Sequence, residues 1–364
     1  MSVVLQREAI VGCILGTAVG DAMGLPYEGI APDRASRLLG PPDRYRFFFG
    51  RGMVSDDTEH TCMVAQSLIE AGGDVDLFVE RFATRLKWWI LALPAGVGMA
   101  TARSAIKLWL GMKPTSAGVF SAGNGPAMRA AIFGVAIPDV SQMLEMIRAS
   151  TRMTHTDPKA EFGAIAVALA ARHSGAHVAI DSNRWFEQVR DTLGNEATEL
   201  IALLRRAIES VKAGESTRRF ADSLGLTRGV TGYIDHTVPV AIHAWLSHPN
   251  DFRGAVTSII GCGGEADTTA AIVGGIVGSG VRRDGIPNAW IEGIAEYPRS
   301  IAWMQKVAET LATVDFAKAP QQCGAVSRFT TKAPTVNPIA VLLRNLLFLQ
   351  IVLYHGFRRL APPY

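Results

Sequence analysis

Two acidic segments far apart in the chain contain the residues best suited to chemistry. The first is Ser55–Asp56–Asp57–Thr58–Glu59, which directly precedes a helical pattern of apolar residues. Adjacent carboxylates flanked by hydroxyls concentrate the hard oxygen ligands that Mg²⁺ and Mn²⁺ prefer. An alternative is helix capping, in which Asp56 is the N-cap and Glu59 reaches back to it. Either interpretation places this segment at the start of a helix.

The second segment repeats this composition much later in the chain. It reads Gly-Gly-Glu-Ala-Asp-Thr-Thr at 263–269 and precedes a helix of small residues. Capping of that helix by Asp267 or by the threonine after it is the alternative interpretation. A single metal site split between two facing helix starts explains both compositions at once. We therefore predict that Glu265 and Asp267 share divalent cations with Asp56 and Asp57.

The elements that must position these residues are helices. Apolar residues recur at three- and four-residue spacing, whereas alternating strand patterns are scarce, which predicts an all-α fold. The predicted helical segments are 59–71, 76–91, 98–111, 160–173, 195–212, 237–247 and 286–313. Two stretches carry glycine in register, at Gly12, Gly16 and Gly20 and again at Gly274 and Gly278. Such stripes let two backbones approach closely, so we predict a tight helix pair that brings the acidic segments together.

Two loops carry groups suited to a nucleotide. Residues 118–126 form a glycine-rich loop, and glycine permits the close approach by which backbone N–H groups bind a diphosphate without basic side chains. Residues 154–158, Thr-His-Thr-Asp-Pro, lead into another helix, with Asp157 as its N-cap and Pro158 as its first residue. The alternatives are that residues 118–126 are an ordinary connection between helices and that the histidine of residues 154–158 has only a structural role.

Three motifs together resemble the ADP-ribosylglycohydrolase family. They are GDAMGLPYE at 20–28, SDDT at 55–58 and GGEADTTAAIVGG at 263–275, and the similarity spans about residues 8–300. Each motif alone is weak, whereas their order and spacing are specific. The resemblance implies a compact multi-helix bundle with a central dinuclear site for two divalent cations, Mg²⁺ or Mn²⁺. In the first motif, Asp21 is expected to be buried and paired with backbone donors near the metals.

The resemblance also implies roles for individual residues. The metal ligands would be Ser55, Asp56, Asp57, Glu265, Asp267 and Thr268, and the residues that bind ADP-ribose would be Ser121, Gly123, Asn124 and His155. Glu28 matches the family's glutamate that positions water or gates the cleft, and it joins Asp56, Asp57 and Asp267 as a catalytic residue. The sequence departs from the family at Glu265, where a GGDxDT pattern usually carries aspartate. Because octahedral coordination tolerates little change in ligand length, this departure puts the second metal position in question.

The implied function is hydrolysis of the glycosidic bond between ADP-ribose and a modified target, with release of ADP-ribose. Breaking this bond passes through an oxocarbenium-like transition state, and cations can hold the ribose hydroxyls and activate a water molecule. Two alternatives remain open, a non-catalytic ADP-ribose-binding protein and a metal-dependent phosphohydrolase of a nucleotide diphosphate. The partner would be an ADP-ribosylated protein or small molecule, whose identity the sequence does not specify.

Composition excludes several other classes of protein. The 36 basic and 33 acidic residues give a net charge of +3 and are spread along the chain, so no nucleic-acid partner is indicated. The 4 cysteines lie far apart without a CxxC pair, which argues against a zinc site and a disulfide framework. Free thiols are typical of a reducing compartment, and we therefore expect a cytoplasmic protein.

The domain organisation that we expect is one large domain over 1–317, a linker over 318–337 and an apolar helix within 338–364. An early apolar stretch, 9–20, is too short to span a bilayer. The late apolar stretch is interrupted by Arg344, Asn345 and Gln350, which favours a docked helix or a homodimer contact over a membrane span. The basic pair Arg358 and Arg359 leaves contact with a membrane surface as the alternative.

Overall fold

The computed structural model describes residues 3–176, 179–317 and 331–360, and this part of the chain is all-helical, as the sequence predicts. Between the α-helices of the described ranges lie three short 3-10 helices, Leu25–Tyr27, Pro114–Ser116 and Gly194–Ala197, and isolated backbone bridges in place of a sheet. Much of the expected linker, 318–330, lies outside the described residues, and 331–337 have no regular secondary structure. The α-helices are α1 (Val3–Gly24), α2 (Pro32–Leu39), α3 (Asp56–Ala71), α4 (Val75–Leu91), α5 (Met99–Trp109), α6 (Gly125–Met128), α7 (Ala131–Ala136), α8 (Val140–Arg152), α9 (Pro158–Gly175), α10 (Ser182–Leu193), α11 (Thr198–Lys212), α12 (Thr217–Ser223), α13 (Ile234–Ser247), α14 (Phe252–Ile260), α15 (Ala266–Gly285), α16 (Asn288–Glu292), α17 (Ile301–Leu311) and α18 (Pro338–Arg358).

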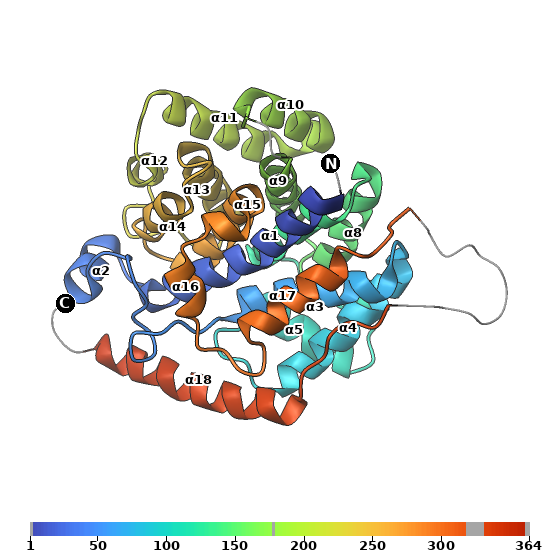
Figure 1. Cartoon of the computed structure of the whole chain (residues 1–364). Helices are drawn as coiled ribbons and strands as arrows, with labels where there is room; N and C mark the ends of the chain where they lie inside the picture. Colours follow the sequence, from blue (N-terminus) through green and yellow to red (C-terminus); the bar gives the residue numbers. More distant parts are fainter. Residues whose placement is uncertain (1–2, 177–178, 318–330, 361–364) are drawn as a thin grey trace, which may run out of the picture.

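The crossing of α1 and α15 forms the centre of the molecule (Figure 1). A Cβ atom on Gly16 would lie 2.1 Å from the carbonyl oxygen of Gly274, and one on Gly12 would lie 2.1 Å from that of Gly278. The two backbones are therefore in direct contact, which confirms the predicted tight helix pair. By length and composition the first helix resembles a membrane span, but its apolar window is 100% buried and forms part of the core.

The helix predicted over 286–313 is interrupted, and this part of the prediction is wrong. Helix α16 ends at Glu292 and α17 begins at Ile301. Between them the chain pairs with Gly52, whose N–H donates to the carbonyl of Gly293 at 3.1 Å and whose carbonyl accepts from the N–H of Ala295 at 2.7 Å. Gly293 and Pro298 lie in the break, and a proline cannot continue a helix, so the sequence carries a signal for the break that the spacing of apolar residues overrode in the prediction. The pairing with Gly52 has no such local signal.

Helix α18 lies along one edge of the bundle (Figure 1). Two of the three polar residues that interrupt its apolar stretch, Arg344 and Asn345, face the domain, whereas Gln350 is exposed. Arg344 forms an ion pair with the buried Glu296, with Nε 3.0 Å from Oε2, and also donates to the carbonyl of Val54 at 2.5 Å. The side-chain amide of Asn345 donates to the carbonyl of Ala92 at 2.8 Å. These contacts hold one face of the helix against the domain.

Candidate active site

The end of α1 meets the start of α3 around Asp21. The carboxylate of Asp21 is fully buried and accepts hydrogen bonds from the backbone N–H groups of Ser55 at 2.9 Å and Thr58 at 3.2 Å. The Thr58 hydroxyl donates to the same carboxylate. Because N–H groups in the first turn of a helix have no intrahelical acceptor, Asp21 supplies one and fixes this helix start. Burial raises the pKa of Asp21 to about 7.

The capping arrangement of α3 differs from the predicted one. Ser55 is the N-cap, and its hydroxyl oxygen accepts from the N–H of Asp57 at 3.3 Å. Glu59 does not reach back to the cap but accepts from Trp89 Nε1 at 2.6 Å and from Arg299 Nη1 at 2.5 Å. Capping therefore does not explain the adjacent carboxylates at the start of α3.

A direct hydrogen bond joins the two acidic segments. The Thr268 hydroxyl donates to Asp57 Oδ2 at 3.2 Å, and the Ser55 hydroxyl donates to the same oxygen at 3.0 Å. The other oxygen, Asp57 Oδ1, is buried and has no hydrogen-bond partner. A buried unpaired acceptor is costly and calls for a compensating group such as an ion or a water molecule. In the second segment, Asp267 Oδ1 accepts from the N–H of Thr268 at 2.8 Å.

Burial and mutual repulsion make these carboxylates hard to ionise. Burial raises the pKa values of Asp56, Asp57 and Asp267 well above the ordinary range, and their negative neighbours raise them further. Burial also raises the pKa of Glu28, although the positive charge of Arg359 and a hydrogen bond with Asp267 oppose this shift. Perturbed carboxyl groups gathered at a cleft are typical of functional sites, and a bound cation would favour their ionised forms.

Backbone hydrogen bonds fix the loop of Glu28 beside the second acidic segment. The N–H of Gly29 donates to the carbonyl of Gly264 at 2.7 Å, and the N–H of Glu265 donates to the carbonyl of Val230 at 2.9 Å. Gly264 has a φ of 75°, and a Cβ atom there would lie 1.9 Å from the carbonyl oxygen of Val230. Only glycine fits this position, so the glycine pair of the motif serves loop packing.

The glycine-rich loop closes the opposite side of the site. The N–H of Asn124 donates to the carbonyl of Gly232 at 2.9 Å, and its side-chain amide donates to the Thr237 hydroxyl at 3.2 Å. The side chain of Asn124 also interacts with Glu265 and opposes the rise that burial causes in the pKa of Glu265. A predicted metal ligand and a predicted substrate-binding residue are thus direct partners across the cleft.

His155 lies beneath the glycine-rich loop. The ring is 4% exposed, and its Nδ1 lies 2.9 Å from the Thr154 hydroxyl, which accepts from Arg129 at 2.7 Å. A Cβ atom added to Gly123 would lie 3.1 Å from Nε2, so this nitrogen faces the loop. Burial and the positive charge of Arg129 lower the pKa of His155 to about 3. The ring is therefore neutral at physiological pH, which suits ligand binding.

The acidic segments and the two loops enclose a cleft of about 250 Å³. Most of the predicted site residues line it together: Glu28, Asp56, Ser121, Gly123, Asn124, His155, Glu265, Asp267 and Thr268. Ser55 and Asp57 lie behind this wall and connect to it through Thr268. Sequence reasoning missed Gly96, Met99 and Thr101, which line the cleft from the start of α5 and the loop before it. Glycine and proline at 92–97 mark that loop, but no pattern singled out Thr101.

The chemistry of the donor set fits small divalent cations. Carboxylates and hydroxyls from both acidic segments approach one another, and the unpaired Asp57 Oδ1 provides a buried anionic acceptor. Within the described ranges, however, no three His, Cys, Asp or Glu side chains converge in an arrangement that could hold an ion. Hydroxyls and water would have to complete the coordination, which agrees with the preference of Mg²⁺ for few carboxylates and several waters.

The structure is an all-α bundle in which the starts of α3 and α15 bring carboxylates together beside a glycine-rich loop. This combination of fold and site is the one that the family resemblance implies. The family model for ADP-ribosylglycohydrolase matches residues 3–321, so the chain belongs to the ADP-ribosylglycohydrolase family, as its motifs predict.

Individual relatives agree with this assignment. The chain is 32% identical over 307 residues to an uncharacterized protein of Archaeoglobus fulgidus, an alignment that covers 80% of this chain and 93% of that protein. It is 26% identical to ADP-ribosyl-(dinitrogen reductase) glycohydrolase of Rhodospirillum rubrum, with 78% and 90% covered. It is also 26% identical to ADP-ribosylhydrolase ARH3 of Gallus gallus, with 82% and 91% covered. A solved ADP-ribosylglycohydrolase-related protein complex shares the fold, with a TM-score of 0.61 at 23% identity over 85% of this chain and 99% of that chain.

Proposed function

We propose that this protein is a divalent-metal-dependent hydrolase that cleaves the bond between ADP-ribose and a modified target and releases ADP-ribose. The observation that carries the proposal is the hydrogen bond from Thr268 to Asp57, because it joins two acidic segments whose other carboxylates, Asp56 and Asp267, open on one cleft. Relatives named for ADP-ribosyl glycohydrolase and ADP-ribosylhydrolase activity support the type of reaction.

The residues that would hold the cations are Asp56, Asp57 and Asp267, together with the hydroxyls of Ser55 and Thr268. Bound Mg²⁺ or Mn²⁺ would orient the hydroxyls of the distal ribose and lower the pKa of a nearby water molecule. Glu265 would contribute less directly than the aspartate usual in the family, because its side chain is one methylene longer and interacts with Asn124.

We propose that Glu28 positions the water molecule that attacks the glycosidic bond. Glu28 lines the cleft beside Asp267, next to the proposed cations. The opposite wall, with Ser121 and Gly123, would bind the diphosphate, and the neutral His155 would contribute a polar contact from below. The cleft of about 250 Å³ is smaller than the roughly 300–1,000 Å³ of pockets that enclose a whole ligand. We infer that it encloses the ribose end of ADP-ribose and leaves the adenine outside.

The test is the release of ADP-ribose from a panel of ADP-ribosylated peptides in Mg²⁺, Mn²⁺ or chelator. Wild type is compared with an Asp56→Ala, Asp57→Ala double variant and with Asp139→Ala, which removes an aspartate that caps α8 instead. We expect metal-dependent release by wild type and Asp139→Ala and no release by the double variant, with thermal melts to confirm that all three proteins are folded.

Three outcomes would contradict this proposal in different ways. Tight binding of ADP-ribose without release would identify a binding protein. AMP and ribose phosphate as products would identify a phosphohydrolase. Release that persists in chelator would show that the cations are not required.

A further inference from the structure

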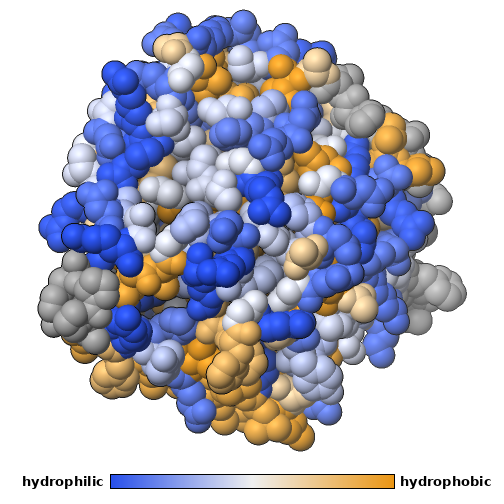
Figure 2. Space-filling view, turned by 60° about the vertical axis from the view of Figure 1, so that its left-hand side comes forward, coloured by the Kyte–Doolittle hydropathy of each residue, from blue (hydrophilic) through white to orange (hydrophobic). Residues whose placement is uncertain are grey.

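The C-terminal helix α18 carries an apolar face that the described residues leave uncovered. Ile339, Leu343, Leu353 and Phe357 expose 68%, 62%, 51% and 71% of their surfaces. Figure 2 shows apolar side chains gathered along the lower edge of the molecule, at the level where α18 lies in Figure 1. Contiguous apolar patches on a polar surface mark interaction sites. The family match ends at residue 321, so α18 lies outside the part shared with the family.

The contacts on the opposite face of α18 limit the orientations in which the helix can bind a partner. Arg344 and Asn345 are buried there, bound to Glu296, Val54 and Ala92 of the domain. By length and composition α18 could cross a membrane, but crossing would pull these polar groups out of their buried contacts. A helix that stays docked and lies flat keeps them. The exposed face can therefore meet only a surface that lies alongside the helix.

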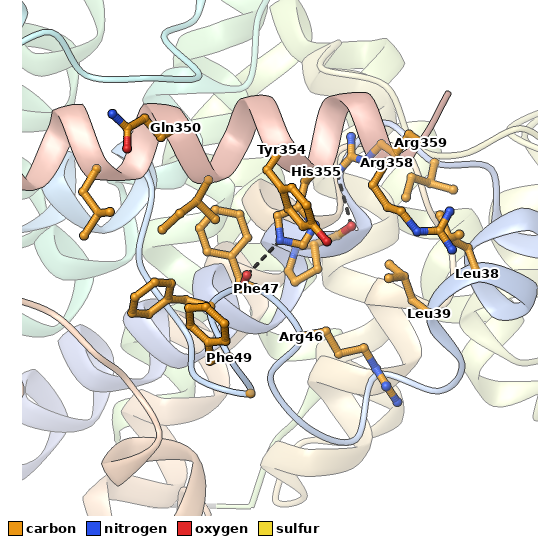
Figure 3. A pocket seen from close by; sticks show the side chains of 16 residues that line it. Leu38, Leu39, Arg46, Phe47, Phe49, Gln350, Tyr354, His355, Arg358 and Arg359 are labelled. Atoms are coloured by element: carbon orange, nitrogen blue, oxygen red, sulfur yellow. Dashed lines mark hydrogen bonds between the residues drawn. The ribbon is translucent and has the colours of Figure 1, made fainter. Parts of the chain in front are cut away.

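A second apolar element lies beside the helix. Phe49 is 95% exposed at a tight turn closed by two hydrogen bonds between Phe48 and Arg51, and its φ of 45° turns the side chain outward. Between this turn and α18 lies a cavity of about 680 Å³, whose apolar wall includes Phe47 and Ile351 (Figure 3). The His355 ring fixes the distance across it, because Nε2 lies 2.8 Å from the carbonyl oxygen of Phe47.

Positive charge surrounds one end of this apolar surface. Arg46, Arg358 and Arg359 line the same end of the cavity together with Leu38 and Leu39 (Figure 3), and Arg46 forms an ion pair with the exposed Asp43. Residues 338–360 contain no Asp or Glu. An apolar face with an arginine rim is the pattern of helices that lie in the interface of a membrane. Basic residues next to such a face favour anionic headgroups.

We propose that the apolar face of α18, the turn at Phe49 and the arginine rim form a docking surface for an anionic phospholipid bilayer. In this arrangement α18 lies parallel to the membrane, its apolar side chains enter the headgroup region, and the arginines contact lipid phosphates. A second copy of the chain is the less favoured occupant. It would bring the same arginines to the contact without any acidic residue from its own α18, so the charges would repel rather than complement.

The proposal is tested by sedimentation of the full chain with vesicles of phosphatidylcholine alone or mixed with phosphatidylglycerol. We expect binding to the mixed vesicles only, weakened by added salt. Leu343→Gln combined with Phe357→Gln should weaken binding by roughly tenfold or more, because each removes exposed apolar surface from the interface. Arg358→Gln should weaken it about fivefold, as expected for the loss of one basic residue near an anionic surface.

Matched control variants distinguish binding through this surface from nonspecific binding to vesicles. Ile106→Gln with Leu110→Gln changes two residues that are 53% and 78% exposed near the end of α5, and Arg228→Gln removes an exposed arginine elsewhere. Both controls should bind like wild type, with circular dichroism confirming the fold. The proposal is overturned by a lack of binding to mixed vesicles or by equal losses in the controls. It is also overturned if the chain is a dimer that the Leu343 and Phe357 changes convert to a monomer. No readout uses hydrolysis, so the result is independent of the proposed function.

Discussion

Replacement of Gly16 by alanine should damage both the stability and the site of this protein. The new Cβ atom would lie 2.1 Å from the carbonyl oxygen of Gly274, where ordinary contact begins at 3.4 Å. The obstacle is backbone, which cannot rotate away as a side chain can, so α1 and α15 would have to separate by about 1 Å. Overpacking of this kind costs roughly 1–3 kcal/mol or more of the free energy of unfolding.

The same separation should reach the cleft, because the two helices carry Asp21 and Asp267. A displacement of about 1 Å in a catalytic arrangement can reduce the rate by ~100-fold. Urea unfolding and ADP-ribose release would measure the two effects. Gly356→Ala in α18 is the matched control, because nothing lies within 4 Å of its Cβ position; it should gain up to about 1 kcal/mol from helix propensity and keep full activity. A Gly16→Ala protein as stable and active as wild type would refute this reasoning.

Three further substitutions test other parts of the structure. We expect Mg²⁺ to raise the melting temperature of wild type, by a stabilisation of about 2.7 kcal/mol at 100 times the dissociation constant. Asp57→Asn should abolish this rise, and an equal rise in both proteins would exclude Asp57 as a ligand. Burial lowers the pKa of His243 from 6.5 to about 4, so the unfolded chain takes up its proton first and stability is lost as the pH falls through this range. His243→Gln should remove this dependence on pH. In urea titrations, the difference in the free energy of unfolding between wild type and variant should change by up to ~1.4 kcal/mol per pH unit between the two pKa values. A difference that stays constant with pH would contradict this prediction. Arg359 donates to the carbonyl of Pro26 at 3.2 Å, beside Glu28. Arg359→Ala should therefore lower kcat several-fold, and Arg359→Lys should restore part of it. An unchanged kcat in both variants would show that the end of α18 does not influence the site.

The features that the sequence predicted best are those that depend on local chemistry. A close backbone contact requires glycine on both helices, so Gly16 and Gly274 could be recognised without knowing how the chain folds. Likewise, adjacent Asp56 and Asp57 before a helical pattern identified a helix start rich in oxygen ligands. The repeated composition of the two acidic segments and the glycine stripes then predicted that both helix starts lie together, and Asp56 and Asp267 line one cleft.

The features that the sequence could not predict depend on contacts between distant segments. Glu59 has the spacing of a capping residue, yet Trp89 and Arg299 from other elements bind its carboxylate. The break before α17 coincides with Gly293 and Pro298 and could have been predicted, but the pairing of this segment with Gly52 could not. Thr101 reaches the cleft because α5 packs there, and a lone threonine on a helix carries no signal of its own.

The central helix pair and the acidic cluster impose opposite demands on this fold. The carboxylates of Asp56, Asp57 and Asp267 repel one another when ionised, which adds to the rise that burial causes in their pKa values, so without a compensating charge they favour separation of the helix starts. The glycine contacts between α1 and α15 resist that separation, because the two backbones pack directly and are surrounded by core. The cluster can therefore keep its geometry before any cation binds. On this argument, the core supplies the free energy that keeps the two acidic segments close together, and cation binding should stabilise the protein without separating α1 from α15.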